Sequence, residues 1–521
     1  MAPGVLFLLR GVGVIAATAV CTVLALARTR FVAPAVEKSM AEMSGRDTAY
    51  AEIDAYLEAQ LTRLNLPGAA LAIVEGDEIA HLRTFGEARP GGDAPTAQTP
   101  FFIGSLTKSF TALAVMQLVE AGKIELDAPI QRYLPWFKVA DPQASAQITV
   151  RHLLNQTSGL SQPSGMVPLA DFDESPDAVE RQARRLATFK PPRLPGAAWE
   201  YSNANYNLLG LIVEAGSGES YADYLHNHIF TPLEMRHSHT AKGDAQQDGL
   251  AVGHRVWFGV PIAAPDLPVP QGSLPSGQLT ASAEDMAHYL IAHLNGGGYG
   301  AAQILSTEGI AEMHRPAVKA NAAGIDMGAY GMGWFVEDTP HGRRIWHYGQ
   351  TPDYFAYMAL VPEQQRGLVL LVNANQMLLN FALSEVGAGA AELLAGGQPA
   401  SFPWGVIPWL LGGVLLIPIM QIGGVSATLR RVRRWQQEPD SRPGRARLWL
   451  LHILAPIGVS LLLVGFAVGL LATNLRKMIL LFMPDLSWLL LICGGFALVW
   501  SFLRTRLVLG SVAQGGSTFD R

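Results

Sequence analysis

The sequence predicts a mixed domain of strands and helices, of the α/β or α+β class, joined to a membrane-embedded C-terminal part. Apolar runs of strand length alternate with helix-like stretches between residues 39 and 400, and three apolar segments of membrane-spanning length follow. The composition agrees, because hydrophobic residues make up 49% of the 521 residues and charged residues only 16%. Soluble domains average about 25% charged residues, so this balance indicates one soluble part and one membrane part.

Charge and cysteine content exclude several classes of protein. The formal net charge of −5 gives no support for nucleic-acid binding, so we expect no nucleic-acid partner. The two cysteines, Cys21 and Cys493, both lie inside apolar runs. Neither a disulfide framework nor a thiolate metal site can be built from them.

The N-terminal segment, residues 1–30, is predicted to be a signal peptide or a membrane anchor. Gly11 to Ala27 is apolar and has arginines on both sides, and it ends in Ala25-Leu26-Ala27, a small-x-small sequence that signal peptidase can cut. Cleavage and retention stay open. Both place the residues that follow outside the cytoplasm.

Four segments of the predicted soluble domain, residues 39–400, have a clear secondary-structure pattern. They are a buried strand at Ala69–Val74, a helix at Ser105–Ala121 stopped by Gly122, a helix at Asn205–Ala215 and a buried strand at Leu368–Val372. The stretch Pro261–Gly277, rich in Pro and Gly, is too long for a simple turn. We therefore expect it to border a site.

The predicted membrane domain, residues 401–521, contains three spans: Trp404–Gly423, Leu448–Ala472 and Leu486–Leu503. Each is long enough to cross about 30 Å of hydrocarbon as a helix. Seven arginines lie in the loop expected between the first two spans, and such a cluster stays in the cytoplasm. We therefore predict a protein of a bacterial cytoplasmic (inner) membrane, with the soluble domain on the periplasmic or outer face.

A candidate nucleophile opens the helix predicted after residue 104. In Ser105-Leu106-Thr107-Lys108, spacing of three places the serine and the lysine on one helix face. A serine hydroxyl is a weak nucleophile until a nearby base takes its proton. A lysine can be that base if desolvation lowers its pKa enough to keep it neutral.

Two further motifs follow in chain order. Tyr201-Ser202-Asn203 can supply a proton relay and an amide that points the same way from an extended segment. His347-Tyr348-Gly349 follows a strand-like run at 344–346 and precedes Gln350. Each motif alone is a weak signal.

The three motifs together resemble the serine β-lactamase and penicillin-binding-protein superfamily, most of all its class C-like branch. Its second motif is Tyr-x-Asn and its third is Lys-Thr-Gly or His-x-Gly. Surrounding stretches match as well, and the resemblance covers about residues 50–395. These stretches are Ile148–Leu154, Thr157–Leu160, Pro195-Gly196 and Thr280–Met286.

The resemblance implies an α+β fold: a central antiparallel sheet flanked by helices, plus an all-helical lobe, with the cleft between them. It also implies that Ser105 forms an acyl-enzyme, with Lys108 and Tyr201 as one coupled base. Backbone N–H groups of Ser105 and Gln350, beside Gly349, would hold the oxyanion. Substrate would be bound through Asn203 and through His347, which shapes the hydrogen bonds around Tyr201. No metal or organic cofactor is implied.

One position departs from the family pattern. The family usually has glycine after Thr-Pro, whereas Asp353 follows Pro352 here. Two interpretations stay open: recognition of a polar substrate group, and an altered loop.

The layout narrows the substrate to a small molecule or peptide that is met outside the cell. A periplasmic domain followed by three spans is similar to the prodrug-activating peptidases of non-ribosomal peptide pathways, which remove an N-acyl-D-asparagine cap. The alternatives are an esterase, a D,D-peptidase or a β-lactamase acting on another substrate. A third class is a β-lactam sensor, although the zinc-protease motif of such sensors is absent from the sequence. The lipid bilayer is the other expected partner, and the sequence does not predict an oligomeric state.

Overall fold

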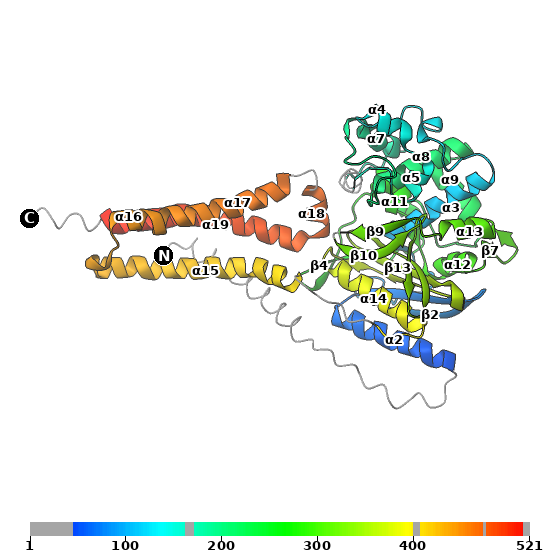
Figure 1. Ribbon diagram of the computed structural model, residues 1–521. Helices are drawn as coiled ribbons and strands as arrows, with labels where there is room; N and C mark the ends of the chain where they lie inside the picture. The colour runs from blue at the N-terminus through cyan, green and yellow to red at the C-terminus, as the bar shows by residue number, and fades with distance from the viewer. Residues whose placement is uncertain (1–44, 162–170, 323, 400–406, 473–475, 514–521) are drawn as a thin grey trace, which may run out of the picture. The chain divides into compact units, whose positions relative to one another are not determined.

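The structure is a computed structural model that describes residues 45–161, 171–322, 324–399, 407–472 and 476–513. Two compact units make up the chain, one within residues 36–402 and one that includes residues 403–521 (Figure 1). The predicted signal peptide or anchor, residues 1–30, lies outside the described residues.

The first unit, which we call the catalytic unit, contains helices alone in the described residues between β3 and β4 and a run of strands from β9 to β15. Its longer strands are β1 (Gly68–Glu75), β2 (Glu78–Gly86), β4 (His254–Trp257), β5 (Val260–Ala263), β9 (Val318–Ala322), β10 (Ile325–Tyr330), β11 (Phe335–Thr339), β12 (Gly342–Gln350), β13 (Phe355–Val361) and β14 (Arg366–Val372). Two-residue strands are β3 (Phe101–Phe102), β6 (Thr280–Ala281), β7 (Gly298–Tyr299), β8 (Ala302–Gln303) and β15 (Ala374–Asn375). Its α-helices are α2 (Gly45–Arg63), α3 (Thr107–Glu120), α4 (Pro142–Gln147), α5 (Val150–Leu154), α7 (Ala178–Arg184), α8 (Asn203–Ser217), α9 (Tyr221–Leu225), α10 (Lys242–Gln247), α11 (Leu274–Gly277), α12 (Ala283–Leu294), α13 (Thr307–Met313) and α14 (Leu379–Leu394).

An antiparallel sheet of eight strands is the centre of this unit, with the order β2-β1-β14-β13-β12-β11-β10-β9. The predicted α+β fold with a central antiparallel sheet is thereby confirmed. The predicted strands at 69–74 and 368–372 are β1 and β14, which pair with each other near its middle. The helices predicted at 105–121 and 205–215 are α3 and α8.

Both faces of the sheet are covered by helices. Leu71 and Ile73 of β1 belong to the hydrophobic core with α2 and α14, whereas Ala70 and Ala72 pack into the core that contains α3, α8 and α12. Burial on both sides explains why β1 reads as an unbroken apolar run without polar alternation.

Helix α3 runs through the middle of the second core, so it is buried on nearly all sides. The sequence predicts an apolar side that includes Ala112, Val115, Met116 and Val119. The structure buries the first three and also the polar residues on the other sides, Lys108 among them, while Val119 is only partly buried. The helix is therefore a central element with no solvated polar face at its start.

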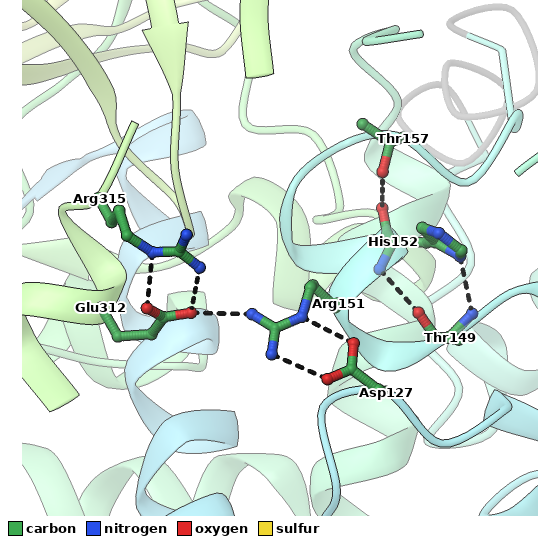
Figure 2. A network of polar contacts seen from close by, with 7 residues as sticks. All are labelled: Asp127, Thr149, Arg151, His152, Thr157, Glu312 and Arg315. Atoms are coloured by element: carbon green, nitrogen blue, oxygen red, sulfur yellow. Dashed lines mark hydrogen bonds and ion pairs between the residues drawn. The ribbon is translucent and has the colours of Figure 1, made fainter. Parts of the chain in front are cut away.

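The helices α4, α5, α7, α8 and α9 lie together beyond one side of the sheet (Figure 1). Figure 2 shows how α5 is fixed to its surroundings. The guanidinium of Arg151 donates to both oxygens of Asp127, at 2.8 and 3.0 Å, and to Glu312 of α13 at 2.8 Å. Glu312 also accepts two hydrogen bonds from Arg315. This network ties the helical lobe to α13, which follows β8.

The second unit, which we call the membrane unit, consists of helices: α15 (Ile407–Gln437), α16 (Arg445–Leu448), π-helical turns at Trp449–Leu454, α17 (Ala455–Ala472), α18 (Arg476–Phe482) and α19 (Pro484–Ala513). Three segments are long and apolar enough to cross a membrane: Gly412–Gln437, Arg445–Gly469 and Pro484–Ser511. The prediction of three C-terminal spans is therefore confirmed, although residues 404–406 of the first lie outside the described residues.

The arginine cluster corrects one sequence-based expectation. Helix α15 continues through Arg430, Arg431, Arg433 and Arg434, which the sequence predicts as loop residues. Arginine is a good helix former, and nothing in this stretch interrupts the helix before Pro439. Arg445 and Arg447 lie in α16. The connection between the spans is thus much shorter than the sequence suggests.

Candidate active site

The candidate nucleophile, Ser105, lies in a single 3₁₀ turn, Gly104–Leu106, directly before α3. The turn is closed by Thr107, whose hydroxyl donates to the carbonyl of Gly104 at 2.7 Å. Spacing of three along this turn brings Lys108 Nζ to 3.0 Å from Ser105 Oγ. The pair predicted from the sequence is therefore in hydrogen-bond contact.

Two glycines allow the end of β12 to pass against this turn. A Cβ on Gly349 would lie 1.9 Å from the carbonyl oxygen of Ile103 and 2.8 Å from the backbone nitrogen of Ser105. A Cβ on Gly104, whose φ is +53°, would lie 2.4 Å from the backbone nitrogen of Gln350. The backbone nitrogens of Ser105 and Gln350 therefore belong to two segments in direct contact, and only glycine fits at either position.

Lys108 is fully buried, and its amine has only neutral partners among the described residues. Besides Ser105, its Nζ donates to the carbonyl of Ser276 at 2.5 Å and lies 4.9 Å from the ring centre of Tyr201. Burial lowers the pKa of Lys108 well below its ordinary value, because no carboxylate offsets the lost hydration. A neutral amine beside a serine hydroxyl can accept its proton.

Tyr201 lies two residues before α8 and packs partly buried beside Trp199 and Phe335. Desolvation raises the pKa of Tyr201 well above its usual value, and a hydrogen bond to Ser105 opposes that shift only in part. Its phenol therefore keeps its proton at neutral pH. Lys108 and Tyr201 are thus shifted in opposite directions, one toward a free amine and the other toward a phenol that can donate.

The segment around Tyr201 is held from behind by Gln156. The side-chain oxygen of Gln156 accepts from the backbone nitrogen of Ser202 at 2.9 Å and from the amide of Asn205 at 2.5 Å. Ser158 in turn donates to Asn205 at 2.5 Å. These contacts explain why the stretches 148–160 and 201–207 occur together in the pattern.

Asn203 requires a correction. The sequence predicts that it projects from an extended segment, but Asn203 is the first residue of α8 and only Ser202 before it is extended. Asn203 is buried, and none of the hydrogen bonds within the described parts of the chain uses its side chain. Its amide is thus placed at the start of a helix with both hydrogen-bonding groups available.

His347 lies in β12 with its ring centre 6.3 Å from that of Tyr201. Its Nδ1 lies 2.6 Å from the carbonyl of Tyr348, which can only accept, so this nitrogen carries the hydrogen. The buried Nε2 then presents a bare lone pair with no partner among the described residues. Burial, assisted by Lys108, lowers the pKa of His347 to about 3, so the ring is neutral.

The unusual Asp353 is engaged within the protein. Its Oδ1 accepts from Arg255 Nε of β4 at 2.7 Å, and its backbone oxygen accepts from His254 at 3.2 Å. Burial raises the pKa of Asp353, while Arg255 opposes that shift. Of the two interpretations above, the geometry favours an altered turn between β12 and β13 that is anchored to β4.

Two residues at the site received no role from the sequence. Ser276 contributes only its backbone carbonyl, so its side-chain type carries no signal; the one available clue was the long stretch 261–277, which does border the site. Gln156 lies between two stretches that match the family pattern, and that position was its only signal. Ser276 is 168 positions from Lys108, and Gln156 is 46 positions from Ser202, whose backbone it holds.

The geometry brings together the Ser105 hydroxyl, the Lys108 amine with its lowered pKa, the Tyr201 phenol and the closely packed segments that carry the Ser105 and Gln350 backbone nitrogens. These groups can support nucleophilic attack on an acyl carbon, proton transfer and stabilisation of the developing oxyanion. The family model that matches residues 53–385 is described as "Beta-lactamase". The chain therefore belongs to the β-lactamase and penicillin-binding-protein superfamily, a family of serine hydrolases.

Particular relatives fit this assignment. Penicillin-binding protein 4 of Amycolatopsis lactamdurans is 30% identical over 321 residues, which cover 61% of this chain and 83% of the relative. Protein flp of Staphylococcus aureus (strain MW2) is 27% identical over 330 residues, 62% of this chain, and the match spans only 63% of flp. Among solved structures, the octameric penicillin-binding protein homologue from Pyrococcus abyssi has a TM-score of 0.59 and 26% identity, covering 67% of this chain and 78% of its own.

Proposed function

We propose that this chain is a membrane-anchored serine hydrolase that works through an acyl-enzyme on Ser105. The observation that carries the proposal is the 3.0 Å contact between Ser105 Oγ and the amine of Lys108, which is buried without a carboxylate partner in the described residues. An uncharged amine at this distance is a competent general base.

The reaction follows from the protonation states. Lys108 takes the proton of Ser105 as Oγ forms a bond to the acyl carbon, and the carbonyl electron pair moves to its oxygen. That oxyanion lies against the N–H groups of Ser105 and Gln350, each worth about 2.7–4 kcal/mol in such sites. The oxyanion then re-forms the carbonyl, the bond between the acyl carbon and the leaving group breaks, and the leaving group takes the proton through Tyr201. Water repeats the sequence on the acyl-enzyme and releases the acid.

Asn203 and His347 are proposed to orient the substrate. The Asn203 amide can donate to and accept from a substrate amide at the start of α8. The neutral His347 accepts a hydrogen bond at Nε2, from the Tyr201 hydroxyl or from the substrate. A charged imidazole here would repel a protonated Lys108 and disturb the proton path.

For the location, we propose a bacterial cytoplasmic membrane with the catalytic unit on the periplasmic side. The arginines of α15 and α16 support this orientation, since positively charged helix ends stay in the cytoplasm. A reporter inserted after Asp440, between these helices, should be active only as a cytoplasmic reporter. Activity of a periplasmic reporter there would overturn the orientation.

For the substrate, we propose an N-acyl-D-amino-acid cap, of the D-asparagine kind, on an exported prodrug. The support is the combination of an outward-facing hydrolase with three spans, which suits processing after export. The broader alternative is an esterase, D,D-peptidase or β-lactamase-type enzyme, and a β-lactam sensor that is acylated only once is the alternative of another class. Turnover separates the sensor from all the enzymes.

The deciding experiment uses the purified full chain and the variant Ser105→Ala. A fluorophosphonate probe should label the wild type at Ser105 by intact-mass and peptide analysis, and the variant should remain unlabelled and inactive. Labelling at another residue would remove the nucleophile assignment. Matched D- and L-asparaginyl amides should then differ at least tenfold in rate, about 1.4 kcal/mol. Equal rates would leave the serine mechanism in place and eliminate the D-peptidase proposal.

A further inference from the structure

Three basic side chains from separate helical segments meet at one end of the membrane unit. Arg431 of α15 donates through Nη1 to Nδ1 of His452, in the π-helical turns before α17, at 3.1 Å. Arg504 of α19 interacts electrostatically with both of them, and Arg447 of α16 also acts on His452. Because Nδ1 of His452 is the acceptor, this ring nitrogen carries no proton and the histidine does not add a charge through it. The cluster Arg431–His452–Arg504 thus brings two guanidinium charges within electrostatic range of one imidazole.

These charges are not balanced by carboxylates in the described residues. No ion pair joins either arginine to an acid there, and Glu438 is engaged by Arg434 at 3.0 Å. Asp485 lies at the opposite end of α19, roughly 30 Å from Arg504 along the helix. The Nε of Arg504 is buried without a hydrogen-bond partner among the described residues. Arginine stays charged in proteins, so within the described residues the two guanidinium charges have no anionic partner.

The side chains around the cluster indicate which kind of ligand would supply an anion. Large apolar side chains in the π-helical turns that carry His452 are exposed, including Trp449, Leu450 and Leu451. A ligand that offers a phosphate to the guanidinium groups and hydrocarbon to these side chains matches both features. We propose that the Arg431–His452–Arg504 cluster binds the phosphate of an acidic phospholipid. The proposal does not depend on the catalytic function.

The test uses the full chain, stripped of lipid in a neutral maltoside detergent and offered phosphatidylglycerol or phosphatidylcholine. Binding is measured by native mass spectrometry. The wild type should prefer phosphatidylglycerol at least tenfold. Arg431→Gln and Arg504→Gln should each weaken that binding about fivefold, as expected for loss of one basic residue at an acidic lipid surface, about 1 kcal/mol.

Arg506→Gln is the matched control, because Arg506 lies two residues further on α19, is exposed and rests 4.9 Å from the ring centre of Phe502. It removes the same charge from the same helix and should change binding less than twofold. Equal losses in Arg504→Gln and Arg506→Gln would show diffuse attraction and overturn the site. If inorganic phosphate raises the unfolding temperature of the stripped protein as much as the lipid does, the ligand is free phosphate and the lipid proposal fails. Arg431 lies on another helix. If Arg504→Gln does not fold, binding by Arg431→Gln therefore tests the site.

Discussion

Lys108 in the catalytic unit and Arg504 in the membrane unit pose the same electrostatic problem. The Lys108 side chain is fully buried, whereas in the partly buried Arg504 only Nε is removed from water, and neither side chain pairs with a carboxylate in the described residues. A lysine can solve the problem by losing its proton, whereas an arginine cannot. The comparison teaches that an unpaired buried lysine indicates a base, and an unpaired buried arginine indicates a missing anion.

The change Lys108→Arg tests whether the buried lysine acts as a base, and it should have the largest effect on the acylation rate. The guanidinium stays protonated and cannot accept the Ser105 proton, so acylation by a fluorophosphonate probe should slow about 10²- to 10⁴-fold. The exposed Lys138→Arg is the control and should acylate at the wild-type rate. A rate within tenfold of wild type in Lys108→Arg would mean that charge, and not proton transfer, is what this position supplies.

Tyr201 provides the next test, because its pKa is shifted in the direction opposite to that of Lys108. Tyr201→Phe and Lys108→Ala should each lose most activity, by about 10²-fold or more, and the double variant should be little worse than the poorer single one. Groups that share one proton-transfer step are strongly non-additive. If the fold-losses of the two single variants multiply in the double variant, in steady-state or single-turnover rates, then the two residues act in independent steps.

His347 is a third desolvated base, and from its lowered pKa we expect a smaller effect, which concerns the stability of the fold. Its pKa is about 3 in the folded protein, below the ordinary histidine value of about 6.5. Between these values the unfolded chain binds more protons, so stability should fall as pH falls from about 6.5 toward 3, by at most about 1.4 kcal/mol per pH unit. Above pH 6.5 this contribution is constant.

The midpoint of thermal unfolding is measured at pH 7.5 and at pH 5, with near-ultraviolet circular dichroism as the signal. His347→Gln should lose less on acidification than the wild type. Some loss should remain, because burial also lowers the pKa of His293 well below its ordinary value. An identical loss in both proteins would contradict a neutral, desolvated His347.

The sequence predicts those parts of the site that depend on residue type and short spacing. Ser105 and Lys108 are three residues apart on one helix, so their contact follows from helix geometry alone. The apolar run of β1 likewise identifies a strand buried on both faces. The contact between Asp353 and Arg255 could not be predicted, because the two residues are 98 positions apart and the fold alone brings them together.

Two other failures have local causes. The arginines at 430–434 look like a loop by charge, but charge does not end a helix, and α15 continues to Gln437. The sequence predicts an extended segment at Asn203 because the helix expected in this region begins only at Asn205. The hydrogen bond from Ser202 to the distant Gln156 ends the extended conformation at that point, and α8 begins one residue later.

The contact between β12 and the Ser105 turn has a consequence for how this site can vary. Neither Gly104 nor Gly349 has space for even one methyl group, since each would meet backbone atoms closer than 3.0 Å. The separation of the Ser105 and Gln350 nitrogens is therefore set by the main chain and is closed to adjustment by substitution. Variation at this site is therefore confined to side chains around the fixed pair of nitrogens, while the main-chain frame itself stays constant.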